Sequence, residues 1–440
     1  MAFCNLSNAM MSVHFPIHRL EKLSKSGIGK PYAVFQTPIM YDTITPGAEL
    51  GCVGEVNCVP QLDTIRVLPW APNTAVALAE FYTRDIEKDS ISGSASPYCS
   101  RSFLKKQLAT LKSEFGYEPV VGLEVEFILF KGYDPVTKLP IKLDDFMYCE
   151  DQCWNTIGGK VLTELCETLQ DLGIEVYTFH PESGNGQYEL SLGPAPMLRA
   201  ADDLLFIRQA LRAIATKHGL NATATPKILL DQPGNGAHIH LSLVDSTGKN
   251  IFPDSTAEKK FSKPAEHFIA GVLDHMDAIP AVSMPSINSY ARVAKSMWAS
   301  YYVTWGYENR EVTARIACPP YGGSYNNVEF RPHDGAANPY LAFGTYLAAG
   351  MDGMRRKLEL GVDMKDDPAV LPEEEIEKLG LRTLPRSLPE ALDNLAKDQV
   401  LIDALGPDLY RVFTSVKRFE YETISKWSFE DQIKLFTSRY

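Results

Sequence analysis

The chain of 440 residues is long enough for one large domain or for two to three domains of ordinary size. Its 43 basic and 55 acidic side chains give a net charge of −12, which argues against nonspecific binding to nucleic acid or to an anionic membrane. Apolar residues make up 45% and charged residues 22%, so a disordered or fibrous chain is excluded. No apolar run reaches the roughly 18 residues of a membrane span. We therefore expect small molecules and cations as partners.

The cysteines and the first residues of the chain bear on its compartment. Eight cysteines are too few for a disulfide scaffold, and no two of them form a CxxC pair. Residues 1–13 contain no Lys or Arg, so neither a secretory signal nor a mitochondrial presequence is indicated. We expect a reduced, cytoplasmic protein.

The first part of the chain differs in pattern from the rest. Short β-rich runs at residues 32–35 and 62–68 alternate with Pro and Gly, and the Ser-rich residues 89–97 indicate a linker. This pattern predicts a small sheet domain over residues 1–96 and a larger domain over residues 97–440.

Helical and strand patterns alternate through the larger domain. The predicted helices cover residues 101–116, 160–172, 199–219 and 340–360, and the predicted strands cover residues 120–130, 174–179, 187–192, 237–244, 298–305 and 326–331. Asn338 and Pro339 form the expected start of the fourth helix, and Ser387 with Glu390 forms a capping box for a further C-terminal helix. The fold class is therefore α+β, with a multistranded antiparallel sheet backed by helices.

Polar residues gather on one face of several predicted strands. Because side chains alternate along a strand, Glu124 and Glu126 share one face of residues 120–130 and leave an apolar face on the other side. Two more carboxylates flank the glycine-rich loop at residues 183–186. The residues aligned in these ways are Glu124, Glu126, Glu182, Glu189, His238, His240, Ser242, Asn327, Glu329 and Arg331.

Two interpretations of this polar face are open. Alternating glutamates or histidines are commonly the solvated face of an ordinary strand, but here the face repeats Glu and His rather than Lys, Thr and Ser. Inward carboxylates repel one another unless cations neutralise them, and oxygen donors with an imidazole suit Mg²⁺ or Mn²⁺. Nearby arginines could clamp a phosphate or a carboxylate, with surface solvation as the alternative for each. These arginines are Arg292, Arg310, Arg315 and Arg331.

Two further features have simpler structural interpretations. His180 is expected to support the glycine-rich loop. The aromatic cluster of Trp298, Tyr301, Tyr302 and Trp305 is more typical of a core than of a binding site.

Taken together, these segments resemble the glutamine synthetase family in order and approximate spacing, from about residue 52 to the end of the chain. The motifs that carry the resemblance are Gly122-Leu123-Glu124-Val125-Glu126-Phe127, Gly186-Gln187-Tyr188-Glu189 after Glu182, Gly234-Asn235-Gly236-Ala237-His238-Ile239-His240-Leu241-Ser242, Asn288-Ser289-Tyr290-Ala291-Arg292, Asn309-Arg310 followed by Arg315, Glu329-Phe330-Arg331, and Ala337-Asn338-Pro339-Tyr340-Leu341. The resemblance implies a shortened, β-grasp-like N-terminal domain and a catalytic domain with a curved antiparallel sheet.

The family resemblance also implies a reaction and roles for the residues. The reaction is an ATP-dependent ligation in which a carboxylate, expected to be the γ-carboxylate of glutamate, attacks the γ-phosphate and an amine displaces phosphate from the acyl phosphate. One Mg²⁺ or Mn²⁺ would be held by Glu126, Glu182 and Glu189. The other would be held by Glu124, His238 and Glu329. The matches place Arg292, Arg331 and Gly234 at the substrate. Arg310 and Arg315 match residues at the transferring phosphate, and Arg315 also lies at ATP. His240 and Ser242 match residues that line the nucleotide site.

Three positions depart from the family pattern and bear on the substrate. Trp298 replaces the glutamate that binds and deprotonates ammonium, and an indole offers an apolar or cation–π wall to an organic amine instead. Pro233 replaces an asparagine that contacts glutamate. Asn327 replaces an arginine that contacts phosphate. We therefore predict an organic amine or a polyamine as the acceptor, with Trp298 at its site.

Several alternatives stay open at the level of the sequence. The chain could use ammonia as a glutamine synthetase does, or it could be a noncatalytic relative with a structural or regulatory role. A metal hydrolase is disfavoured, because the arginines suit phosphate better than a neutral amide. The family resemblance also implies a ring-shaped homo-oligomer in which the N-terminal domain completes the active site of a neighbouring subunit.

Overall fold

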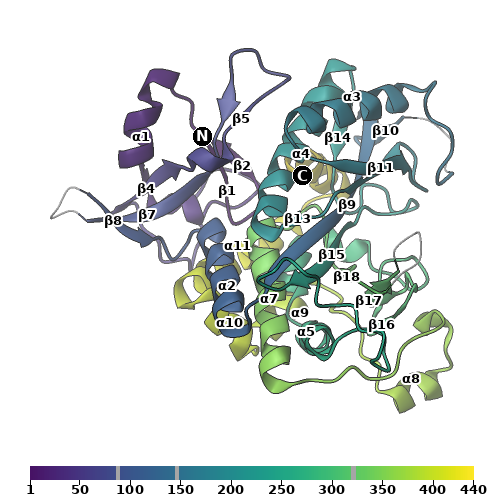
Figure 1. The fold of residues 1–440 in the computed structure, drawn as a ribbon. Helices are drawn as coiled ribbons and strands as arrows, with labels where there is room; N and C mark the ends of the chain where they lie inside the picture. The colour runs from purple at the N-terminus through teal and green to yellow at the C-terminus, as the bar shows by residue number, and fades with distance from the viewer. Residues whose placement is uncertain (86–89, 144–147, 319–323) are drawn as a thin grey trace.

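The computed structural model describes residues 1–85, 90–143, 148–318 and 324–440. Figure 1 shows a small N-terminal sheet on one side of the molecule and a larger sheet on the other, with helix α7 (Pro339–Arg356) running between them. The architecture is mixed α/β, with a large sheet and helices packed on it. No helix among the described residues combines the length and apolar character needed to cross a membrane.

The N-terminal part contains three small sheets. A four-stranded sheet has the order β3-β4-β7-β8, and the pairs β1-β2 and β5-β6 lie beside it. The elements are β1 (Ala2–Cys4), β2 (Met10–Ser12), α1 (Leu20–Ser26), β3 (Ile28–Pro31), β4 (Glu55–Pro60), β5 (Arg66–Val67), β6 (Ala75–Val76), β7 (Ala79–Asp85) and β8 (Ser90–Ala95). The β-grasp comparison and the boundary between residues 96 and 97 stay predictions.

Three predictions in this part were wrong. Tyr32–Phe35 forms a 3₁₀ helix, in which Phe35 turns inward against Phe81, with 4.8 Å between the ring centroids. Residues 62–68 begin with a 3₁₀ turn closed by a hydrogen bond from the Ile65 N–H to the carbonyl of Leu62 (3.3 Å), so only Arg66–Val67 is a strand. The predicted linker contains β8, because its backbone pairs with β7 despite its serines; Asp89 lies outside the described residues.

The large sheet has ten strands, and β9 is its longest member. The path runs β11-β12-β9-β15-β18-β17-β16, and three short strands also pair with β9. The strands are β9 (Glu118–Tyr133), β10 (Pro140–Lys142), β11 (Val176–Pro181), β12 (Gln187–Leu192), β13 (Ala195–Pro196), β14 (Asn221–Thr223), β15 (Ala237–Val244), β16 (Tyr302–Tyr307), β17 (Val312–Ala317) and β18 (Asn327–Phe330). All described pairs in this sheet are antiparallel except β16 with β17, so the antiparallel prediction was right apart from that pair.

The predicted strand over residues 298–305 was only partly right. β16 begins at Tyr302, because Ser296, Trp298 and Ser300 adopt left-handed backbone conformations with φ of 55°, 53° and 62°, which a strand cannot contain. The sequence pattern missed β17 altogether. Thr313 and Arg315 alternate with apolar residues in β17 as they would in a half-exposed strand, but every residue of this six-residue strand is buried.

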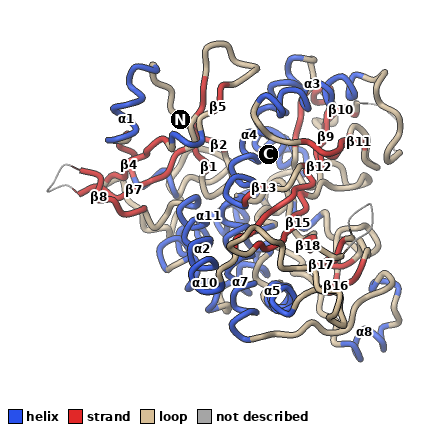
Figure 2. Tube along the Cα trace, in the orientation of Figure 1, coloured by secondary structure: helices blue, strands red, loops and turns tan. Residues whose placement is uncertain are grey.

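Helices cover the large sheet and one another and, apart from the exposed α8, carry much of the remaining core. They are α2 (Ser100–Phe115), α3 (Ile157–Asp171), α4 (Met197–Lys217), α5 (Lys263–Asp274), α6 (Pro280–Ser283), α7, α8 (Glu373–Leu379), α9 (Leu388–Leu395), α10 (Gln399–Leu405), α11 (Pro407–Ile424) and α12 (Phe429–Arg439). As predicted, the Asn338 side chain caps α7 by accepting from the N–H groups of Tyr340 and Leu341. Ser387 likewise caps α9. Figure 2 shows the helices gathered around α7 and at the two ends of the sheet.

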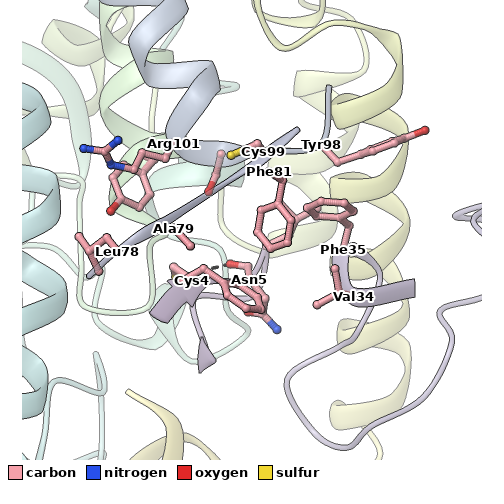
Figure 3. Close-up of a pocket in the computed structure, with 14 residues that line it drawn as sticks. Cys4, Asn5, Val34, Phe35, Leu78, Ala79, Phe81, Tyr98, Cys99 and Arg101 are labelled. Carbon is pink, nitrogen blue, oxygen red and sulfur yellow. Dashed lines mark hydrogen bonds between the residues drawn. The ribbon is translucent and has the colours of Figure 1, made fainter. Parts of the chain in front are cut away.

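The two parts of the chain share one continuous core. Phe3 packs edge-on against Phe81, and these residues line an apolar pocket beside the start of α2 (Figure 3). Arg101 of α2 ties the parts together through Glu80 of β7 and Asp202 of α4. This pocket contains no group of carboxylates, so the polar face of the large sheet is the better candidate for a site.

Candidate active site

The pairing of four strands brings the predicted polar residues into rows across the sheet. His180, Glu189 and Glu126 lie directly opposite one another on β11, β12 and β9. In the next row Glu124 of β9 faces His238 of β15. Since Leu123, Val125, Phe127 and Leu129 on the other face of β9 are all buried, the predicted orientation of this strand is confirmed.

A first group of side chains surrounds Glu124. His238 Nδ1 lies 3.3 Å from Glu124 Oε2 and 3.4 Å from Glu329 Oε1, and His240 Nε2 lies 3.2 Å from Glu124 Oε1. Burial alone would raise the pKa of Glu124, but the two histidines hold it well below its usual range. Although burial disfavours the charged imidazole, the carboxylates of Glu124 and Glu329 raise the pKa of His240 to about 9.

A second group contains the other three predicted carboxylates. Burial is the main reason that the pKa of Glu126 and that of Glu182 are raised, and repulsion from Glu189 adds to both shifts. Glu126 Oε2 accepts hydrogen bonds from the Gly236 N–H (2.9 Å) and from Gln187 Nε2 (3.3 Å). The three carboxylates are therefore close enough to repel one another.

These residues fit divalent cations. Ligand atoms lie within 4.8 Å of one another in the group Glu124, Glu189 and His238 and in the group Glu124, His240 and Glu329. His238 Nε2 is buried and makes no hydrogen bond. These groups differ from the predicted ligand sets in two ways. Glu189, predicted for one ion, groups with Glu124 and His238, which were predicted for the other, and His240 was predicted at the nucleotide. The assignment of three ligands to each ion remains a prediction.

Buried arginines border Glu329, which is fully buried. Arg315 of β17 and Arg331 both form ion pairs with its carboxylate. Burial would raise the pKa of Glu329, but Arg331 and the two histidines of β15 hold it below its usual value. Arg315 also lies 3.6 Å from Glu308, so it is engaged on two sides.

Arg292 and Arg331 are the predicted carboxylate-binding pair, and they are neighbours. Arg292 donates from Nη2 to the carbonyls of Arg331 (3.3 Å) and His333 (3.4 Å), while the Nε atoms of both arginines are buried without a hydrogen-bond partner. At Gly234 a Cβ atom would lie 2.5 Å from the Pro226 carbonyl oxygen and 2.7 Å from Arg292 Cγ, so only glycine fits. Gly234 thus permits the close approach of its loop to Arg292.

Trp298 lies at an exposed edge of this region. Its backbone N–H donates to Glu311 Oε1 (2.8 Å), and its backbone carbonyl accepts from Arg331 Nη2 (2.8 Å). The residue is 62% exposed, and the guanidinium of Arg310 lies 5.8 Å from the centroid of its ring. Its predicted place in an aromatic core was therefore wrong, whereas Trp305 is buried as expected.

Two predicted site residues stay outside the central group. Arg310 is exposed and contacts Trp298 rather than the carboxylates. Ser242 lies opposite Val120 of β9, two residues after His240, and is half-buried. Asn327 does join the group, because its Oδ1 lies 2.9 Å from His240 Nδ1.

The reading of strand faces missed two residues of the region and gave a third, His180, only a supporting role. Gln187 Nε2 bridges Glu126, the Gly234 carbonyl (3.0 Å) and Asn235 Oδ1 (3.0 Å), and its place two residues before Glu189 on one strand face was an available signal. Glu311 lies just before β17 and outside the motifs, so no local signal pointed to it. His180 does border the loop as expected, but it also lies 3.5 Å from Glu189, whose hydrogen bond raises the pKa of His180 to about 9.

The two groups of glutamates and histidines, with buried arginines beside Glu329, are the donor set typical of enzymes that bind divalent cations and anionic substrates. Residues 97–434 match the family described as "Glutamine synthetase, catalytic domain". A glutamine synthetase of Pyrococcus furiosus is 36% identical over 361 residues, which are 82% of this chain and 78% of the relative. A gamma-glutamylpolyamine synthetase, GlnA3, of Streptomyces coelicolor is 32% identical over 418 residues, 91% of this chain and 84% of the relative.

Solved structures agree with the sequence relatives. A GmaS–ADP complex superposes with a TM-score of 0.83 at 28% identity, over 97% of this chain and 93% of the other. A structure described as a novel glutamine synthase homolog gives a TM-score of 0.84 at 26% identity, over 100% of this chain and 98% of the other. The chain belongs to the glutamine synthetase family and is an ATP-dependent ligase of that type. Enzymes of this family use ATP and divalent metal ions.

Proposed function

We propose that this ligase joins the γ-carboxylate of glutamate to an organic amine through an acyl phosphate. The observation that carries the proposal is the meeting of the carboxylate groups with the arginine pair and with Trp298, which Arg331 links directly. Arg331 pairs with Glu329 on one side and donates to the Trp298 carbonyl (2.8 Å) on the other. A substrate held by this arginine would thus lie between the metal-binding groups and the exposed indole.

The carboxylate and histidine groups are proposed to hold two divalent ions, Mg²⁺ or Mn²⁺. The proposed ligands are Glu126, Glu182 and Glu189 for one ion and Glu124, His238 and Glu329 for the other, with His240 and Ser242 toward ATP. When bound, such ions neutralise charge on the phosphates of ATP. The raised pKa values of Glu126 and Glu182 support this role, because a cation would relieve both burial and repulsion.

Arg292 and Arg331 are proposed to bind a carboxylate of the substrate. Each has a buried Nε without a hydrogen-bond partner, and leaving such a donor unpaired costs about 1–3 kcal/mol. A carboxylate anion would satisfy both donors and offset their positive charge. Arg315 is proposed to stabilise the transferring phosphate, with Arg310 closing over it from the exposed edge.

The acceptor is proposed to be a cationic organic amine bound between Trp298 and Glu311. The indole offers an apolar, electron-rich face, and Glu311, whose carboxylate accepts a hydrogen bond from the backbone N–H of Trp298, is 9% exposed. Among the residues that the structure describes, no Lys, Arg or His forms an ion pair with Glu311. Burial raises the pKa of Glu311, and Asp367 adds to the shift, so an ammonium group would stabilise the charged form.

The same reasoning extends to the assembly. We propose a ring-shaped homo-oligomer that acts in the cytoplasm, with residues 1–96 as a β-grasp-like domain beside the active site of a neighbouring subunit. The eight free cysteines are consistent with a reduced compartment. Light scattering of the full chain tests the assembly, and a monomeric mass would refute the ring.

Phosphate release tests the proposed reaction. The full chain is incubated with ATP, Mg²⁺ and glutamate, and with ammonia, alkylamines, arylamines or polyamines in separate samples. We expect an organic amine to stimulate phosphate release more than ammonia does, with a γ-glutamyl amide as the product by mass spectrometry. Stimulation by ammonia alone would identify a glutamine synthetase. Bound ATP without any stimulated release would identify a noncatalytic relative.

A further inference from the structure

A thiol lies at the outer edge of the carboxylate groups. Cys149 is exposed, and its Sγ is 4.0 Å from Glu182 Oε1. His180, at the end of the edge strand β11 (Figure 2), has its Nδ1 3.8 Å from the same oxygen. Ligand atoms of these three residues all lie within 4.8 Å of one another, although the segments come from separate parts of the chain.

The chemistry of this trio differs from that of the glutamate groups. Oxygen donors suit Mg²⁺ or Mn²⁺, whereas a combination of thiolate, imidazole and carboxylate suits zinc. With Zn–S near 2.3 Å and Zn–N near 2.0–2.1 Å, adjacent ligand atoms of a tetrahedral zinc lie about 3.3–3.6 Å apart. The contacts at 3.8 and 4.0 Å therefore need to close by only about half an ångström.

The surroundings of His180 prepare it for such a role. Its Nε2 lies 3.5 Å from Glu189 Oε1, so a carboxylate is placed to accept the proton of the nitrogen that does not face Glu182. A carboxylate behind a metal-bound histidine orients the ring and strengthens the other nitrogen as a ligand. Zinc binding would replace the contact between Nδ1 and the Pro181 carbonyl (3.1 Å). Three protein ligands on exposed or half-buried side chains would leave the fourth position to water.

We propose that Cys149, His180 and Glu182 form a zinc site that regulates the ligase by taking Glu182 away from the Mg²⁺ site. The inhibitory part of this inference rests on the proposed function, because it requires Glu182 to be a ligand of the catalytic ion. The zinc site itself rests only on the three side chains. Zinc would thus compete at one shared carboxylate, and the thiol would give the site its preference for zinc over magnesium.

Cobalt serves as a spectroscopic probe for the site. The full chain, free of other metals, is titrated with Co²⁺ and the near-ultraviolet thiolate-to-cobalt charge-transfer band is recorded; Zn²⁺ is then added to displace the cobalt. We expect the band in the unchanged protein and its loss in Cys149→Ser. The Zn²⁺ dissociation constant should increase more than about tenfold in Cys149→Ser and in His180→Gln, since even outer ligands of a metal contribute that much. Cys52→Ser is the matched control, because Cys52 is also exposed and free.

Two outcomes would overturn the zinc site: a band that persists in Cys149→Ser, or the absence of any band in the unchanged protein. Inhibition is measured separately, as the effect of Zn²⁺ on the phosphate-release rate of each variant relative to its own rate with Mg²⁺. Equal zinc inhibition of the unchanged protein and Cys149→Ser would overturn the regulatory role. A protein with the cobalt band but no amine-stimulated phosphate release would refute the proposed function while leaving the zinc site intact.

Discussion

The variant Glu126→Gln tests whether Glu126 is a metal ligand or a structural carboxylate. If Glu126 is a ligand, the variant should keep or gain stability without metal but lose stabilisation by Mg²⁺. Glu126 lies directly opposite Glu189, and like charges in this position destabilise a sheet by about 0.2–1 kcal/mol. A glutamine keeps the shape and still accepts from the Gly236 N–H. The metal-free variant should therefore be as stable as the unchanged protein or more stable, by up to about 1 kcal/mol.

The effect of Mg²⁺ on the same variant should be the reverse. An ion present at one hundred times its dissociation constant stabilises the folded state by about 2.7 kcal/mol for each site. Loss of the site that contains Glu126 should remove about that amount from the Mg²⁺-dependent stabilisation. Thermal unfolding with and without Mg²⁺ measures both effects, and titration calorimetry counts the bound ions.

The control for this experiment is Glu118→Gln at the exposed start of the same strand. It removes one negative charge from β9 outside the carboxylate groups, so the Mg²⁺ effect should be unchanged. An undiminished Mg²⁺-dependent rise in the unfolding midpoint of Glu126→Gln would refute the two-metal assignment. A large loss of stability in the metal-free variant would instead make Glu126 a structural residue.

The remaining predictions concern the acceptor and a histidine outside the site. Trp298→Glu should shift the preference from organic amines toward ammonia, measured as the ratio of kcat/KM for the amine to kcat/KM for ammonia, with Trp298→Phe as control. An unchanged ratio would show that this side chain does not select the acceptor. Glu311→Gln should raise KM for a cationic amine by about tenfold, as expected for loss of a charge-assisted hydrogen bond of about 1.5 kcal/mol, and an unaltered KM would remove Glu311 from the amine site. His275 lies between Asp398 (2.6 Å) and Asp352 (3.1 Å), and although burial opposes its charge, these partners raise its pKa above 6.5. Its stabilising effect is therefore complete below about pH 6.5 and is lost as the pH rises through the pKa of the folded state. His275→Gln should lower the free energy of unfolding, measured in urea, more at about pH 6 than at about pH 9. Equal losses at the two pH values would contradict a charged His275.

Local chemistry in the sequence was sufficient for much of the secondary structure. The predicted strands over residues 187–192 and 237–244 match β12 and β15, and Asn338 caps α7 as expected, since period and capping act over a few residues. The failures occurred where tertiary contacts override local preference. Phe35 turns inward from a 3₁₀ helix, and β8 forms from serine-rich sequence because β7 pairs with it. In β17 even the polar Thr313 and Arg315 are buried, since both faces of the strand are covered.

By itself, the sequence determined which side chains share a face of a strand, and its motifs indicated the family. Alternation alone places Glu124 with Glu126 and His238 with His240, because the side-chain period of a strand is a property of its backbone. Only the tertiary structure decided which faces meet. Strand pairing joins segments more than one hundred residues apart, and its register depends on the burial of the whole sheet, so the contact of Glu124 with His238 could not be derived locally. The same holds for Glu311, which meets Trp298 only because the irregular chain before β16 folds back over the start of β17.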